Sequence, residues 1–214
     1  MPTARGSEGR SGRKRSAILD AARTLFLDRG FDGVTMDDVA ATAGASKVTV
    51  YKHFSDKPNL FVGVVTAAID EAEIGTHDLV AALGATEDLP GDLTAFARQH
   101  IVDVTRPHLI RMRRMIIGES RWFPELAAAW HRAGPERAHA SLGEQLRRLA
   151  DRGLLRVPDP VLAAQHLNYL ILAIPVNEAM FTGGDFPAGS RRLRRLADEA
   201  VRVFLAGYAP ERSG

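Results

Sequence analysis

The residues best suited to bind a ligand through polar chemistry lie in one short segment, VTMDDVAATAGASKVTVYKHFSDK, at positions 34–57. Ammonium groups alternate there with hydroxyl, phenol and imidazole groups, on a surface too small to form a core of its own. Such groups hydrogen-bond to the phosphates and base edges of DNA. The candidate DNA-binding residues are Thr35, Ser46, Lys47, Thr49, Tyr51, Lys52, His53 and Lys57.

Two short helices joined by a tight turn would position these side chains. Thr35 is placed to cap the first helix, with Asp38 as the second half of a capping box. Gly44 supplies a left-handed residue that ends this helix, and Ser46 caps the next. Helix, glycine turn and helix form the helix-turn-helix arrangement, in which the N-terminal residues of the second helix contact base edges. The alternative is an ordinary helical hairpin with a solvated outer face.

The second of these helices divides into an inner and an outer face. Val50 and Phe54 lie on one side at i, i+4 spacing and are expected to pack inward. We expect Lys47 and Thr49 to face base edges, and Lys52 to contact either a base or a phosphate. The predicted phosphate contacts come from helix starts, whose N–H groups favour anions, and from neighbouring side chains: Thr35, Ser46, Tyr51, His53 and Lys57.

Residues from about 14 to 61 resemble the DNA-binding domain of the TetR family of bacterial transcriptional regulators. The resemblance is carried by the helix SAILDAARTLFLDRGFDGVT, the helix and turn VTMDDVAATAGAS, the recognition segment VTVYKHFSDK and Leu60-Phe61. Pro58 departs from the family's pattern, but in the first turn of a helix its missing N–H costs little. The resemblance implies a homodimer that binds an inverted-repeat operator on double-stranded DNA.

The composition is that of a soluble globular protein. The chain has 214 residues, 45% of them hydrophobic, enough for one sizeable domain or a small domain fused to a larger one. It has no cysteine, which excludes disulfides, thiolate metal sites and a cysteine nucleophile. There is no apolar signal core at the N-terminus, and the longest strongly apolar run, about residues 167–176, is too short to span a bilayer. We therefore expect a cytoplasmic protein with no membrane partner.

Basic residues concentrate near the N-terminus. The formal net charge is only +2, yet Arg5, Arg10 and Arg13 lie among Gly and Ser with the single acid Glu8. Segment 1–13 offers no apolar surface to bury and is expected to be a disordered basic arm. Such an arm would lie on phosphates or enter a minor groove beside the recognition helix. The alternative is a tail that only aids solubility.

Helical periodicity continues to the C-terminal end, and no segment alternates as a strand would, so the predicted fold class is all-α. We expect a three-helix, helix-turn-helix DNA-binding domain at 14–61, a helical ligand-binding and dimerisation domain at 62–208, and a tail at 209–214. After the recognition helix, helices are expected near residues 56–76, 92–105, 107–120, 124–132, 135–152, 160–182 and 190–206.

Apolar stripes on the last two predicted helices favour contact between two copies of the chain. Each stripe is more apolar than one helix of a small bundle needs, which favours a four-helix contact with a twin. Two recognition helices, roughly 34 Å apart on one duplex, would also select a site better than one. The alternative is that both stripes form the core of one chain. The candidate interface residues are Leu167, Leu170, Ile171, Ile174, Leu193, Leu196, Ala200 and Phe204.

The stretch RRMIIGESRWFPELAAAW, at 113–130, resembles the C-terminal halves of AefR-type regulators within the same family. Methionine and aromatic side chains can line a cavity for a small apolar or aromatic effector, with His and Asn groups orienting its polar atoms. At helical spacing such residues also form ordinary cores. The candidate pocket residues are His100, Met112, Met115, Ile116, Trp122, Phe123, Trp130, Asn168, Tyr169 and Asn177.

Catalytic and cofactor sites find little support in the sequence. The run GESRW at 118–122 begins like a nucleophile elbow but lacks the closing glycine and a preceding strand. The seven histidines are dispersed, with no HExxH motif, so no metal and no cofactor are expected. The predicted function is a homodimeric repressor that a small molecule releases from its operator. An activator or an effector-independent regulator is the nearer alternative, and a helical small-molecule carrier or enzyme is the remote one.

Overall fold

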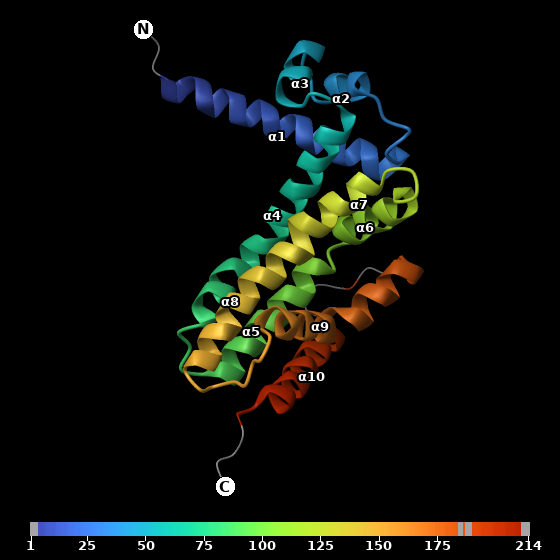
Figure 1. Ribbon diagram of the computed structural model, residues 1–214. Coiled ribbons are helices and arrows are strands. Elements are labelled where there is room, and N and C mark those ends of the chain that lie inside the picture. Colours follow the sequence, from blue (N-terminus) through green and yellow to red (C-terminus); the bar gives the residue numbers. More distant parts are fainter. Residues whose placement is uncertain (1–3, 184–185, 187–189, 211–214) are drawn as a thin grey trace. The chain divides into compact units, whose positions relative to one another are not determined.

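The computed structural model describes residues 4–183, 186 and 190–210, and its regular elements are helices (Figure 1). These elements are α1 (Ala4–Arg29), α2 (Met36–Thr42), α3 (Lys47–His53), α4 (Lys57–Leu83), α5 (Leu89–Val104), α6 (Pro107–Glu119), α7 (Pro124–His131), a π-helical turn (Arg132–Glu136), α8 (Arg137–Asp151), α9 (Pro160–Thr182) and α10 (Arg191–Tyr208). No strand occurs among the described residues, in agreement with the all-α prediction.

Several helix ends lie where local capping signals predict them, although α4 continues to Leu83, beyond its expected end near residue 76, and α5 begins at Leu89, before residue 92. Asp159 caps α9 by accepting from the N–H of Leu162 at 3.0 Å, and Gly183 ends the helix with a φ of 72°. Pro135 differs, because it lies inside the π-helical turn instead of opening a new helix. The wider turn accommodates a ring that would collide with a carbonyl one turn earlier in an α-helix.

The chain forms two compact units. The N-terminal unit comprises the residues up to Ala68 together with Arg111–His131, and the C-terminal unit comprises Ile69–Ile110 and the residues from Arg132 onward. These packed units differ from the predicted domains at 14–61 and 62–208, which stay a prediction, in that segment 111–131 packs in the unit that holds the DNA-binding helices. Phe123 provides a physical reason, since its ring centroid lies 4.7 Å from that of Phe31.

Phenylalanine rings form the centre of the N-terminal unit. The rings of Phe26 and Phe31 stack with centroids 5.7 Å apart, and Phe61 meets them edge-on at 5.2 and 5.3 Å. Each of the three residues is 1% exposed. Burial of such a side chain stabilises a fold by about 1.5–3 kcal/mol, and aromatic pairing adds to this. The cluster thus packs α1 against α4.

Helix α1 begins much earlier than the composition predicts. Segment 1–13 is expected to be disordered, whereas α1 starts at Ala4; residues 1–3 lie outside the described residues. The side chains of residues 11–17 are exposed, and burial begins at Ile18. Ile18, Ala22 and Phe26 hold the helix in place, and extending an existing helix requires no new nucleus. Polar residues can therefore continue it without packing.

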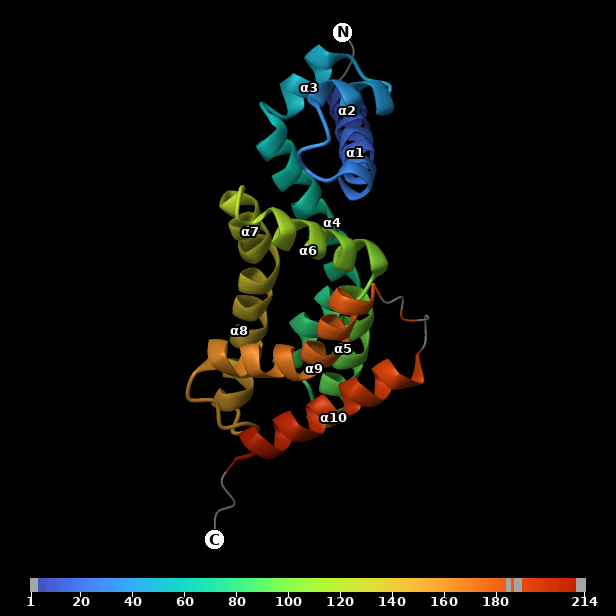
Figure 2. The same cartoon turned by 90° about the vertical axis from the view of Figure 1, so that its right-hand side faces the viewer.

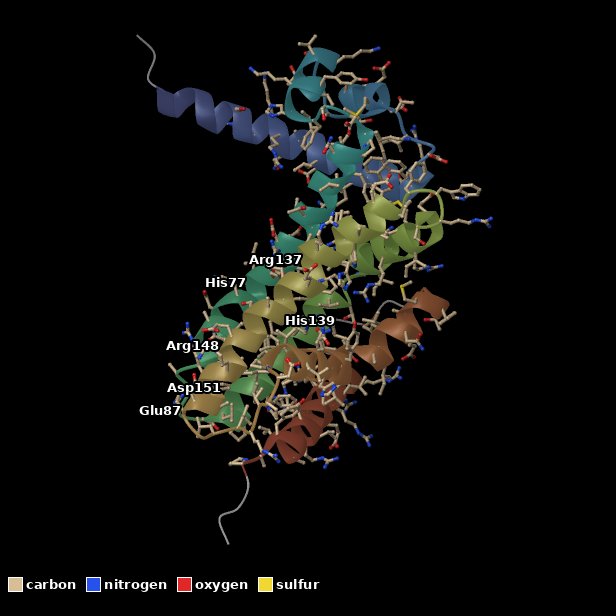
Figure 3. All side chains as sticks on the ribbon, viewed as in Figure 1. His77, Glu87, Arg137, His139, Arg148 and Asp151 are labelled. Atoms are coloured by element: carbon tan, nitrogen blue, oxygen red, sulfur yellow. The ribbon has the colours of Figure 1, made fainter. Side chains whose placement is uncertain are left out.

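Helices α5, α8, α9 and α10 surround one apolar core in the C-terminal unit (Figure 2). Arg98 of α5 forms a bidentate ion pair with Asp198 of α10, at 2.7 and 2.8 Å. Arg137 of α8, which is labelled in Figure 3, donates to Asp70 and Glu73 of α4 at 2.7 and 2.9 Å. Side chains in the centre of this core include Leu93, Ile101, Leu146, Leu167, Ile171 and Phe204.

The last two helices bury most of the side chains predicted for a subunit interface. Leu170 and Ile174 remain on the surface at 38% and 54% exposed, beside the exposed Tyr169 and Phe181, and Leu196 is half-buried. Helix α9 is apolar around much of its circumference, so spacing alone does not reveal which stripe faces inward. The predicted interface residues that instead lie in the core of their own chain, each at most 4% exposed, are Leu167, Ile171, Leu193, Ala200 and Phe204.

Candidate DNA-binding surface

Helix α2 begins with a complete capping box. The hydroxyl of Thr35 accepts from the N–H of Asp38 at 3.2 Å, and the N–H of Thr35 donates to the Asp38 carboxylate at 2.9 Å. Hydrogen bonds from the hydroxyl and the N–H of Thr35 hold the pKa of Asp38 below its usual value. The first turn thus carries the carboxylates of Asp37 and Asp38. Their charge disfavours the phosphate contact predicted for Thr35.

A short turn holds α2 and α3 together. Gly44 has a φ of 60°, and nothing lies within 4 Å of the position that a Cβ would take there. Glycine is therefore favoured at this position by its left-handed backbone conformation, and not by a lack of space for a side chain. The N–H of Ala45 donates to the carbonyl of Ala40 at 3.0 Å. Ser46 then caps α3, its Oγ accepting from the N–H of Thr49 at 3.2 Å.

Helix α3 has one buried side and a broad exposed side. Val50 is fully buried and Phe54, which follows the helix, is 5% exposed, so both point inward as their spacing predicts. Of the predicted DNA-binding side chains on this helix, Lys47, Tyr51 and Lys52 are exposed and Thr49 and His53 are partly exposed. The helix therefore presents its polar residues outward from a small apolar anchor.

Two residues of this surface escape sequence reasoning. Val48 is 78% exposed, and its methyl groups suit the C5-methyl group of a thymine. A signal for it exists, because Val48 and Val50 are two positions apart and cannot share one side of a helix. Asp37 of α2 accepts from the Lys47 ammonium at 2.5 Å. No local sequence pattern predicts that contact, because it joins residues of two different helices.

Lys57, predicted to bind a phosphate, instead binds Phe31 within its own chain. Its ammonium donates to the carbonyl of Phe31 at 3.0 Å and lies 4.4 Å from the centroid of the Phe31 ring. The predicted phosphate contact would have to compete with this bond and with the cation–π contact. Lys57 therefore closes the loop between α1 and α2 in this conformation.

The predicted pocket residues are divided between the two units. In the N-terminal unit Met112 and Ile116 are buried, Met115, Phe123 and Trp130 are half-buried, and Trp122 is 68% exposed beside Arg121. In the C-terminal unit Tyr169 and Asn177 are exposed. His100 and Asn168 of the same unit contact each other, with His100 Nε2 lying 2.9 Å from Asn168 Oδ1.

His100 predicts a pH dependence of stability. Burial lowers the pKa of His100 below its ordinary 6.5, against the opposing effects of the Asn168 hydrogen bond and the Asp103 charge. Below that pH the unfolded chain takes up a proton that the folded chain does not, so stability should fall as the pH drops. Urea denaturation from about pH 7.5 down to about pH 5 would show this. His100→Gln, which cannot be protonated, should flatten the dependence; equal slopes would contradict the assignment.

Two other kinds of site can be assessed from the geometry. Within residues 4–183, 186 and 190–210, no cluster of three or more His, Asp or Glu side chains is arranged to hold a metal ion. Over the same part of the chain, no helix combines the length and the hydropathy that a membrane crossing requires.

Comparison with known proteins identifies both ends of the chain. A family model described as "AefR-like transcriptional repressor, C-terminal domain" matches residues 91–210, and one described as "Bacterial regulatory proteins, tetR family" matches residues 18–64. A crystal structure of a TetR-family regulator from Mesorhizobium loti is 40% identical, with a TM-score of 0.84 over 94% of this chain and 98% of the other. The flavonoid-responsive regulator FrrA is 27% identical, with a TM-score of 0.76 over 94% and 100%.

Curated relatives match over shorter stretches. The transcriptional activator FasR of Mycolicibacterium smegmatis is 37% identical over 35% of this chain and 33% of its own length. The transcriptional repressor AcnR of Corynebacterium diphtheriae is 34% identical over 47% of this chain and 50% of its own length. The match thus spans a third to a half of these relatives. The chain is a DNA-binding transcriptional regulator, not an enzyme, and it belongs to the TetR family of bacterial transcriptional regulators.

Proposed function

We propose that the protein is a homodimeric repressor that binds an inverted-repeat operator in the cytoplasm and leaves it when a small apolar or aromatic molecule binds. The observation that carries the proposal is the outward face of α3, where Lys47, Tyr51 and Lys52 are exposed while Val50 is fully buried. A short helix that packs on the protein through one side and exposes hydrogen-bonding groups on the other is suited to bind in the major groove.

The proposed contacts follow from position on α3 and its neighbours. Lys47 and Thr49 lie in the N-terminal turn and contact base edges, together with the methyl groups of Val48. Lys52 contacts phosphate. The other proposed phosphate contacts are Tyr51 and His53, with Thr35, Ser46 and Lys57 as weaker candidates because each is already engaged within the fold.

Dimerisation is proposed through the exposed apolar side of α9. Tyr169, Ile174 and Phe181 are 57%, 54% and 84% exposed, and Leu170 adds a further 38%. Single exposed apolar residues are normal, but several along one helix favour a protein contact. Two copies joined there would present two recognition helices to a palindrome, as the family does.

The effector is proposed to bind the C-terminal unit, where His100 and Asn168 form a hydrogen-bonded pair. FrrA, similar over nearly the whole chain, is flavonoid-responsive by its name, which favours a planar aromatic molecule here. The effector must bind the DNA-incompetent form more tightly, and DNA must then weaken effector binding by the same factor. AcnR and IcaR of Staphylococcus aureus are negative regulators by name, whereas FasR supports activation as the second candidate.

Two lysine variants test the proposed roles on α3. Duplexes selected from a random pool by the wild-type protein supply the operator, and scrambled duplexes of equal composition supply the reference. Lys47→Met should weaken binding to the selected duplex about tenfold and relax the preference at one base position, because it removes a base contact. Lys52→Met should weaken binding to both duplexes, because it removes a phosphate contact. It should also reduce by about 0.9 the slope of the logarithm of the binding constant against the logarithm of the salt concentration.

Fluorescence anisotropy over a salt series gives both quantities. Equal losses for the two variants on both duplexes would remove the distinction between base and phosphate contacts. A carrier or other helical protein without DNA function predicts no duplex binding at any salt concentration, so wild-type binding decides between the classes first.

A further inference from the structure

An ion pair on the DNA-facing surface joins α2 to α3. The Lys47 ammonium donates to Asp37 Oδ2 at 2.5 Å, with the two side chains 66% and 55% exposed. The Asp37 carboxylate is the main reason why the pKa of Lys47 lies above its ordinary value. Asp37 is not needed to begin α2, because Thr35 and Asp38 complete that cap. The acid therefore has a partner on the contact surface but no part in the cap.

The two helices that carry this pair are held rigidly. Val39, Ala40 and Val50 are at most 4% exposed, and the Ala45 N–H bonds to the Ala40 carbonyl at 3.0 Å. The backbone at Asp37 thus has a defined position relative to the start of α3, where Lys47 is the first helical residue. A lysine on a flexible stem is thereby given a preferred direction before any DNA is present.

Resting on the proposed DNA binding, we propose that Asp37 determines specificity by holding Lys47 for a guanine edge and keeping it from phosphates. An ammonium has three N–H donors, of which Asp37 takes one. The two that remain match the adjacent N7 and O6 acceptors that guanine presents in the major groove. Lys47 can therefore contact guanine without leaving Asp37.

Binding of a phosphate by Lys47, unlike binding of a guanine, competes with the Asp37–Lys47 ion pair. A phosphate offers Lys47 an anion of the same kind that it already has, and the Asp37 carboxylate repels any phosphate that approaches. On DNA without the guanine, Lys47 must either leave its partner or bring a carboxylate toward the backbone. Asp37 thus lowers affinity for non-operator DNA while leaving operator binding nearly unchanged.

Asp37→Asn tests this inference, with Asp28→Asn on α1 as the control that removes the same charge from the same unit. Binding is measured on the selected and scrambled duplexes over a salt series. Asp37→Asn should bind the scrambled duplex about tenfold more tightly at low salt, with a slope steeper by about 0.9, because Lys47 gains a phosphate. Binding to the selected duplex should change by less than about threefold, so the ratio between them falls. Asp28→Asn should shift both duplexes slightly and equally.

The same measurement in a Lys47→Met background shows whether Asp37 acts through Lys47. In that background Asp37→Asn should change the affinities for the selected and scrambled duplexes by the same factor, so the ratio of the two affinities should stay unchanged. Replacing the contacted guanine by 7-deazaguanine, which lacks one acceptor, should weaken binding of the wild-type protein to the selected duplex about tenfold. Binding of Asp37→Asn should weaken much less. A tenfold gain on both duplexes, or none on the scrambled one, would overturn the inference. A wild-type protein that binds no duplex would instead refute the proposed function.

Discussion

Phe31→Ala should unfold the N-terminal unit at a much lower urea concentration than wild type. The side chain is 1% exposed, its ring contacts those of Phe26, Phe61 and Phe123, and it receives the Lys57 ammonium. Truncation of such a residue costs about 3–5 kcal/mol, because a cavity remains as well as the lost apolar contacts. DNA binding should be lost with the unit, since α2 and α3 belong to it.

Tryptophan fluorescence is a selective probe of this effect. The only two tryptophans, Trp122 and Trp130, both lie in the segment 111–131 of the N-terminal unit. The fluorescence transition should therefore move further than the far-ultraviolet circular dichroism transition, which reports on all helices. Ile117→Ala, a truncation at a 58% exposed site of the same unit, should change stability by less than about 0.5 kcal/mol. An unmoved fluorescence transition in Phe31→Ala would refute the prediction.

Arg106→Met should strongly destabilise the C-terminal unit. The Asp103 carboxylate is 1% exposed and accepts from Arg106 at 2.6 Å and from Gln99 at 3.0 Å. Removal of the arginine leaves a buried charge with only a neutral donor, and such losses cost about 3–5 kcal/mol. The circular dichroism transition in urea should move to lower concentration, since this unit holds no tryptophan.

A second variant separates the pair's own contribution from the penalty of an orphaned charge. Asp103→Asn combined with Arg106→Met should recover much of the lost stability, because the buried group is then neutral. Arg147→Met, which removes exposed ion pairs with Glu144 and Asp151, should leave the transition near wild type. A double variant no more stable than Arg106→Met would contradict this account.

Features that depend on neighbouring residues could be predicted from the sequence. The Thr35–Asp38 cap, the Gly44 turn and the Ser46 cap form where expected because each is satisfied within a few residues. The ends of α9 follow for the same reason, from Asp159 and Gly183. Element type and boundaries of this kind need no knowledge of the rest of the fold.

Features that depend on distant contacts could not be predicted. The grouping of 111–131 with the N-terminal helices rests on contacts such as Phe31 with Phe123, which no local pattern encodes. The prediction placed Leu167 and Ile174 of α9 on one interface stripe, whereas Leu167 is core and Ile174 is surface. The Asp37–Lys47 pair escaped for the same reason, because it forms only once the turn has set α2 beside α3.

The sparse anchoring of α3 has a consequence for how such a regulator can change its target. Of the seven residues in this helix, Val50 is the buried one. Exchanges at the outward positions leave the apolar cluster below untouched, so mutation or engineering can explore new operators with little loss of folding free energy. Recognition and stability are thereby assigned to separate residues of this helix, so the target sequence can change while the fold is kept.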